Sequence, residues 1–210
     1  MAKPTQFKYS GEATDSKDNI VYRESHVAIF DGDKILKSAT EYLDTDGKKI
    51  ATLDSDYSLN ENLPVYEFAD LRNNTREGVR LKDEKYEIYL MEKGVEKTIP
   101  LKDKDNTFAG QGWHYYFIKN LSVFEKQNVI LKLILPGKLD VFTFAAKKTA
   151  AAGERLTVLM ELNNWFLRMI APSLKLTYDK PTKRLMVFEG VSNILDKNGK
   201  TQDVKITYKY

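Results

Sequence analysis

Apolar and polar residues alternate with a period of two through most of the first hundred residues. The alternation is clear in QFKYSGEA, which starts at Gln6, and in VYEFADLR, which starts at Val65. Because successive side chains of a β-strand point to opposite faces, this pattern predicts strands with one buried and one solvated face. Short strands at such regular spacing are typical of a meandering antiparallel sheet or barrel.

Glycine and aspartate mark the turns between these predicted strands. Residues 19–58 indicate three strands, joined by turns at 31–33 (DGD) and 44–47 (DTDG). Glycine supplies the positive φ that short hairpin loops need. Further along, Pro136-Gly137 predicts the turn of another hairpin, and the small residues of TAAAGE (149–154) predict a loop before the next strand.

The period changes to three or four residues in GWHYYFIKNLSVFEKQ (112–127), which predicts a helix with one apolar face. Its apolar positions are Trp113, Phe117, Leu121 and Phe124. Ser122 followed three residues later by Glu125 is a capping-box pattern, so we expect a break and a fresh helical turn near residue 122.

A second tight apolar cluster lies between two strand-like segments, in NNWFLRMIAP (163–172). Asn163 or Asn164 can cap a short helix that runs to Ile170, and Pro172 stops it. The ordinary role of an apolar helical face is to pack against protein. On a curled sheet the same helix can also close over a ligand, and both interpretations remain open.

The predicted fold is therefore mainly β (α+β): a single large curved antiparallel sheet, or half-barrel, of about eleven strands with two short lid helices. No repeat, linker or low-complexity tract divides the chain. We expect residues 1–210 to form a single domain, because all-β domains of this length are often undivided.

Composition is that of an ordinary globular protein, with 42% apolar and 30% charged residues. The net charge of +3 is too small to indicate nucleic-acid binding, but it is unevenly distributed. Residues 1–110 carry 17 Lys/Arg and 22 Asp/Glu (−5), whereas residues 111–210 carry 16 and 8 (+8). A basic second half can favour an anionic membrane surface, although a solvated basic face is the simpler interpretation.

Cysteine is absent, which excludes a disulfide framework, a thiolate nucleophile and any Cys-ligated metal. The N-terminal segment MAKPTQFKYSGEA has neither the basic nor the apolar region of a signal peptide. It passes at once into strand-like sequence, as a secreted protein does after removal of its signal peptide.

Candidate chemistry is sparse. Glu24 and His26 share one face of a strand and could act as a base with its orienting partner, although a structural hydrogen-bonded pair is the ordinary outcome. Asp70 and Arg72 also share a strand face, and a surface ion pair is the ordinary outcome there. We treat these four as a candidate polar site. The sequence shows no catalytic serine elbow, phosphate loop or set of three metal ligands, so we expect a non-enzyme without cofactor or metal.

Several segments together resemble a family of uncharacterised bacterial exported proteins. They include YSGEA, YRESHVAIFDG, TEYLDTDGKKIA, FADLR, EGV, GQGWHYYFIKNLSVFEKQNVILKLILPGK and the tail from Ala171 to Tyr208, in the family's order. That family is similar to the Lol-type periplasmic lipoprotein-carrier fold, an unclosed barrel capped by short helices. The resemblance implies a periplasmic protein whose concave face holds an acyl chain or another apolar ligand.

By position in that fold, the resemblance implies an apolar lid formed by Trp113, Phe117, Leu121, Trp165, Phe166, Met169 and Ile170. The chain departs from the carriers because it lacks a lipobox cysteine and its strands carry many charges, which puts a lipoprotein-sized cavity in doubt. The leading hypothesis is a non-enzymatic periplasmic carrier of a lipid or other apolar ligand. The alternative is a structural or interaction protein of the cell envelope with a solid core, docking to an envelope protein or an anionic membrane surface. The sequence does not indicate the oligomeric state.

Overall fold

The computed structural model describes residues 4–164 and 173–210 and contains one continuous sheet of fifteen strands. The strands are β1 Thr5–Thr14, β2 Ile20–Asp31, β3 Lys34–Leu43, β4 Lys49–Asp56, β5 Val65–Asp70, β6 Thr75–Lys82, β7 Lys85–Glu92, β8 Val95–Pro100, β9 Thr107–Phe108, β10 Val129–Leu135, β11 Asp140–Ala152, β12 Arg155–Leu162, β13 Leu174–Asp179, β14 Arg184–Val191 and β15 Asp203–Lys209. The described helices are α1 Gly112–Lys119, α2 Leu121–Phe124 and the 3-10 turn η1 Pro136–Lys138.

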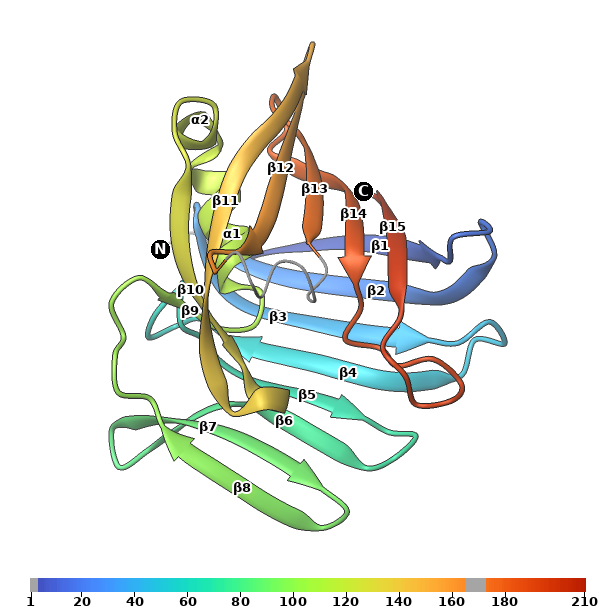
Figure 1. Ribbon diagram of the computed structural model, residues 1–210, viewed down its shortest axis with the longest axis vertical. Coiled ribbons are helices and arrows are strands. Elements are labelled where there is room, and N and C mark those ends of the chain that lie inside the picture. Colours follow the sequence, from blue (N-terminus) through green and yellow to red (C-terminus); the bar gives the residue numbers. More distant parts are fainter. Residues whose placement is uncertain (1–3, 165–172) are drawn as a thin grey trace.

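The sheet consists of two antiparallel meanders joined side by side. Strands β1 to β8 each pair with the next, and so do β10 to β15, while β1 pairs with β15 through Ser10 and Lys209. The short strand β9 pairs with β10 in parallel, opposite Lys132 and Leu133. Because β8 and β9 are the two ends of the strand order, the sheet stays open, and it bends where β1 meets β15 (Figure 1).

A mainly β fold with one large, curved sheet is thus confirmed, but the expected number of about eleven strands is wrong. Each tight turn of the first meander separates two short strands, so eight strands lie within residues 5–100 and seven follow. The two-residue strand β9 is too short to show any periodicity in the sequence. The turns at Gly32 and Gly47 are confirmed, and both glycines have positive φ (57° and 81°).

The loop expected at 149–154 is also wrong, because most of that segment belongs to β11. Ala150, Ala151 and Ala152 pair with β12, after a bulge that follows Lys148. The chain turns only at Gly153, whose φ is 57°. Small residues usually indicate loops, but here the ladder to β12 satisfies the backbone and overrides that preference.

Helix α1 confirms the helical prediction, and α2 confirms a fresh turn after a break. The break falls at Asn120, two residues before the expected position, and Asn120 rather than Ser122 precedes the new turn. The Asn120 backbone amide donates to the Phe117 carbonyl (2.9 Å), and its side chain donates to the Tyr116 carbonyl (2.8 Å). These bonds end α1 two residues earlier than the sequence pattern indicates. Among the described residues, none of the helices is long and apolar enough to cross a bilayer.

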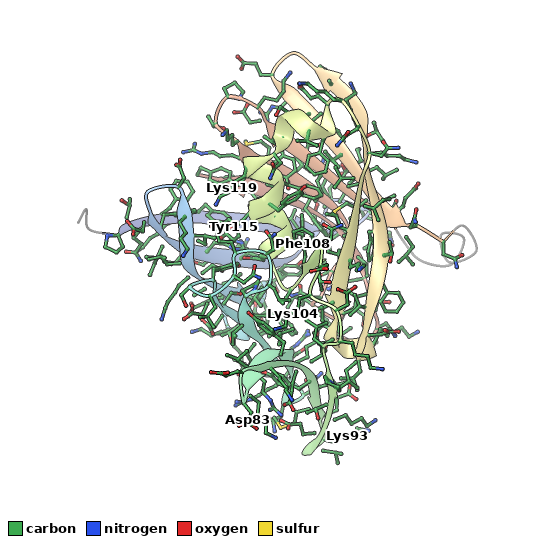
Figure 2. The ribbon with its side chains drawn as sticks, turned by 90° about the vertical axis from the view of Figure 1, so that its left-hand side faces the viewer. Asp83, Lys93, Lys104, Phe108, Tyr115 and Lys119 are labelled. Atoms are coloured by element: carbon green, nitrogen blue, oxygen red, sulfur yellow. The ribbon has the colours of Figure 1, made fainter. Side chains whose placement is uncertain are left out.

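Helix α1 lies between the two meanders, with β1–β3 on one side and β10–β12 on the other (Figure 2). Tyr115 packs with Ala28, Ile35 and Tyr57 in a small cluster on the first meander. Phe117 points the other way, into a larger cluster on the second meander. Gly112 allows the helix to start this close to the neighbouring loop, because a Cβ there would lie 2.3 Å from the Asn62 carbonyl oxygen.

Two large apolar clusters fill the inner face of the sheet. The first cluster, on the first meander, is built around Tyr22, Leu53, Phe68, Val79 and Ile88. The second cluster, on the second meander, is built around Phe117, Phe124, Leu131, Leu156 and Met160. Phe188 and Tyr208 pack against both clusters and so connect the two halves of the core.

Candidate functional site

The alternation of β2 places Glu24 and His26 on the inner face, where both are buried (5% and 4% exposed). His26 Nε2 donates to Glu24 Oε2 (2.9 Å), and Nδ1 hydrogen-bonds to the Thr40 hydroxyl on β3 (2.9 Å). The Tyr9 ring stacks on the imidazole with the ring centroids 4.3 Å apart. Both ring nitrogens are therefore partnered, and the aromatic stack fixes the plane of the ring.

Tyrosines surround this pair. Burial raises the pKa values of the Tyr22, Tyr42 and Tyr208 hydroxyls, and the Glu24 carboxylate adds to each rise. These phenols stay protonated because a second negative charge beside Glu24 would be poorly solvated. Two of them have hydrogen-bond partners: the Tyr22 hydroxyl bonds to the Ser192 hydroxyl (2.8 Å), and the Tyr42 hydroxyl accepts from Asn193 Nδ2 (3.2 Å).

Asp70 and Arg72 form a second, separate pair at the end of β5. Arg72 Nε and Nη2 donate to the two carboxylate oxygens of Asp70 (3.0 and 2.6 Å), and Nη1 donates to the Leu195 carbonyl (2.9 Å). The hydrogen bonds to Asp70 raise the pKa of Arg72 above its ordinary value. This bidentate geometry ties the end of β5 to the loop that precedes β15.

The register shows how far apart the two pairs lie. Glu24 is opposite Tyr42, Tyr42 is opposite Ala51, and Ala51 is opposite Asp70. Three strand spacings of about 4.8 Å separate Glu24 from Asp70 by roughly 14 Å, which is beyond hydrogen-bond reach. The structure therefore brings together the members of each pair and keeps the two pairs apart. Among the described residues, no group of three His, Asp or Glu side chains could hold a metal ion.

The described residues of the expected lid contact protein side chains. Phe117 is fully buried and Leu121 nearly so, both within the second cluster, and the Phe117 ring lies 4.3 Å from that of Phe124. Trp113 is partly buried against the same cluster. The remaining expected lid residues, Trp165, Phe166, Met169 and Ile170, lie outside the described residues.

His114, the second histidine, lies on α1 beside Tyr178. Its Nδ1 is 3.3 Å from the Tyr178 hydroxyl, and the two rings stack with centroids 6.0 Å apart. Burial lowers the pKa of His114 to about 4, and the nearby His26 adds to the effect. His114 is therefore a neutral packing residue at neutral pH.

A hollow that the sequence analysis missed lies on the other face of the first meander. Ala28 packs against α1, so its neighbours Val27 and Ile29 point away from the helix. On that face the structure has a groove of about 780 Å³, which we call the outer groove. Its apolar lining includes Val27, Ile29, Ala39, Val65 and Met91. Its charged lining comprises Lys37, Asp54, Asp56, Glu67, Arg76, Arg80 and Glu96.

The strand register explains the hollow. One row of residues crosses the face from β2 to β7, each member opposite the next: Val27, Ala39, Asp54, Glu67, Gly78 and Tyr89. Ala39 and Gly78 are the smallest members, while the neighbouring rows carry long side chains such as Lys37, Arg80 and Met91. Space therefore remains along the middle of this face.

Tyr89 closes one end of the row through polar contacts. Its hydroxyl donates to Glu67 Oε2 (2.8 Å), and the Arg80 guanidinium lies 5.0 Å above its ring. Arg80 also donates to Glu87 (3.1 Å) and to both oxygens of Glu96 (2.9 and 2.8 Å). Burial and the Glu67 carboxylate raise the pKa of Tyr89, so the hydroxyl remains a donor.

The sequence signal for this groove exists but is weak. Val27, Ala39 and Val65 occupy positions that the alternation assigns to the solvated face, and apolar residues there stand out only once the strands are aligned. The alignment depends on the bulges near Ile29 and Tyr42, which the sequence alone does not locate.

Comparisons with known proteins give a similar solved structure but no family. No family model matches it, and no curated protein matches it. Among solved structures it is similar to a β-barrel-like protein of the domain of unknown function DUF1849 from Brucella abortus. The identity is 12% and the TM-score 0.44, over 98% of this chain and 97% of that chain. The resemblance to Lol-type carriers stays a prediction from the sequence, and the proposals below rest on the geometry of this chain.

Proposed function

We propose that this protein is a non-enzymatic binding or carrier protein whose outer groove holds a lipid or another ligand with an apolar chain. The observation that supports this function is the groove itself, because its volume of about 780 Å³ is that of a small-molecule site. Val27, Ile29 and Met91 provide apolar contacts, and charged side chains such as Asp54, Glu67 and Arg80 also line the groove. The periplasmic location follows only from the family resemblance and stays a prediction.

The size of the groove sets the expected affinity. A fully buried methylene contributes about 0.8 kcal/mol, and an open groove removes only part of each methylene from water. A chain of about ten carbons would gain about 8 kcal/mol if it were fully buried, which corresponds to micromolar binding, so partial burial in the open groove predicts weaker, sub-millimolar binding. The groove does not need to be closed by a lid for such affinity.

The test is a titration with a fluorescent fatty acid, together with native mass spectrometry of the purified protein. Ala39→Leu places a larger side chain in the middle of the groove and is expected to weaken binding at least tenfold. Ala151→Leu, at an exposed position of β11, is the matched control and should leave binding unchanged. If wild type and Ala39→Leu bind the fatty acid equally well, the ligand binds outside the outer groove.

A second candidate function is a structural or interaction protein of the cell envelope. It is favoured by the packing of Phe117, Leu121 and Phe124, which all lie within the second cluster rather than free to cover a ligand. In this case wild type takes up no fatty acid at any concentration below micelle formation. Co-sedimentation with anionic vesicles then tests whether the basic second half docks to a membrane.

A further inference from the structure

Two carboxylates face each other in the middle of the outer groove. Asp54 on β4 is directly opposite Glu67 on β5, and both line the groove. Like charges at directly opposite positions destabilise a pair of strands. The two carboxylates nevertheless lie side by side, in the same row that places Val27 and Ala39 in the groove.

The positive side chains of the groove do not fully neutralise this pair. Arg76 Nη1 lies 3.5 Å from Glu67 Oε1, a long contact, and Tyr89 donates a neutral hydrogen bond to the same carboxylate. Arg80 is occupied by Glu87 and Glu96, and Lys37 lies 3.5 Å from Asp56. The Asp54 carboxylate forms no hydrogen bond or ion pair with a side chain among the described residues. An excess of negative charge therefore remains at the centre of the groove.

Electrostatics agree with this geometry. Partial desolvation, followed by repulsion from Glu67 and Glu41, raises the pKa of Asp54 above its ordinary value, whereas Lys49 opposes the rise. A positive charge placed between Asp54 and Glu67 would remove this repulsion. The charge would also lie beside Val27 and Ala39, which line the groove in the same row.

We propose that the ligand of the outer groove carries a positively charged head group, an ammonium on an apolar chain, which binds between Asp54 and Glu67. The chain then lies along Val27, Ile29 and Ala39, which adjoin Asp54 in the same and neighbouring rows. This inference rests on the proposed function, because it names the ligand class of the same groove.

The experiment compares dodecylammonium with dodecanoate by isothermal titration calorimetry, at matched ionic strength and below micelle formation. Wild type is expected to bind dodecylammonium at least tenfold more tightly. Asp54→Asn and Glu67→Gln should each reduce this preference severalfold, and the double variant should abolish it. Asp46→Asn, an exposed carboxylate in the turn between β3 and β4, is the matched control and should keep the full preference.

The remaining outcomes separate this inference from the proposed function. Equal or tighter binding of dodecanoate, lost in Ala39→Leu, would overturn the ammonium inference and keep the groove as an apolar site. A preference for dodecylammonium that survives in the Asp54→Asn, Glu67→Gln double variant would also overturn it. Binding of neither probe would overturn both proposals.

Discussion

Glu77 on β6 carries a carboxyl group whose protonation depends on the folded structure. Its Oε2 lies beside Gly137 of the turn η1, and a Cβ on that glycine would come within 2.8 Å of the oxygen. Burial raises the pKa of Glu77 to about 7, and repulsion from Glu92 adds to the rise. The folded protein therefore binds this proton more tightly than the unfolded chain does. The free energy of unfolding falls as the pH rises from about 4.5 to about 7, the interval in which only the folded state is protonated.

We predict that Glu77→Gln removes this fall in the free energy of unfolding between pH 4.5 and pH 7. At pH 8 the free energy of unfolding of the variant, measured by urea titration, should exceed that of wild type by about 1–3 kcal/mol. At pH 4 the two proteins should be equally stable. Glu84→Gln, at an exposed turn position, is the control and should change neither value. A Glu77→Gln variant less stable than wild type at pH 8 would contradict the prediction.

At the same scale, the sequence could predict pairs within a strand but not their partners from other strands. Glu24 and His26 share a face because they are two residues apart, and the structure joins them. Thr40, which bonds to the other ring nitrogen, comes from β3 and depends on the register between two strands. Local spacing carries no information about that register, so Thr40 was not a candidate.

At the scale of elements, Gly78 determines how closely β5 and β6 approach. A Cβ at this position would lie 2.0 Å from the Tyr66 carbonyl oxygen, a backbone atom that cannot move aside alone. We predict that Gly78→Ala costs about 3 kcal/mol or more, because the two strands must separate to admit the methyl group. Urea unfolding followed by circular dichroism measures the loss.

Gly153→Ala is the matched control for this substitution. Gly153 has a positive φ of 57° in the turn after β11, and a Cβ there would meet no atom within 4 Å. Its substitution should therefore cost only about 1–2 kcal/mol of backbone strain. If Gly78→Ala lowers the free energy of unfolding no more than Gly153→Ala does, β5 and β6 can separate at little cost and the prediction is wrong.

The elements that the sequence predicted well are those with a local cause. Turns at Gly32 and Gly47 need positive φ, and α1 follows from the spacing of Trp113 and Phe117. The strand β9 and the tail of β11 have no such local cause. The first depends on a parallel pairing with β10, and the second on the ladder to β12.

At the scale of the whole molecule, the outer groove shows why the candidate site was harder to predict than the fold. The sheet follows from many alternating strands, each of which shows its own period-two pattern in the sequence. The groove instead requires Val27, Ala39, Asp54, Glu67 and Gly78 to align across five strands. An error of one residue in any pairing would move half of them to the inner face.

The single domain expected for residues 1–210 makes a prediction at this scale. Phe188 on β14 packs against both the first and the second cluster, so the two meanders share part of one core. We therefore expect one cooperative unfolding transition. Circular dichroism, which reports the whole sheet, and the fluorescence of Trp113, which packs against the second cluster, should give the same midpoint. A Trp165→Phe background leaves Trp113 as the sole emitting tryptophan.

Phe188→Ala tests whether the shared core causes that cooperativity. Removing the ring should cost about 2–4 kcal/mol, since it leaves a cavity between the two clusters. If the meanders unfold as one unit, both probes shift to lower urea by the same amount. If the second meander is an independent unit, the Trp113 midpoint separates from the circular dichroism midpoint. Such a separation, already in the protein with intact Phe188, would contradict the single domain. If the two midpoints separate only in Phe188→Ala, the Phe188 side chain couples the unfolding of the two meanders.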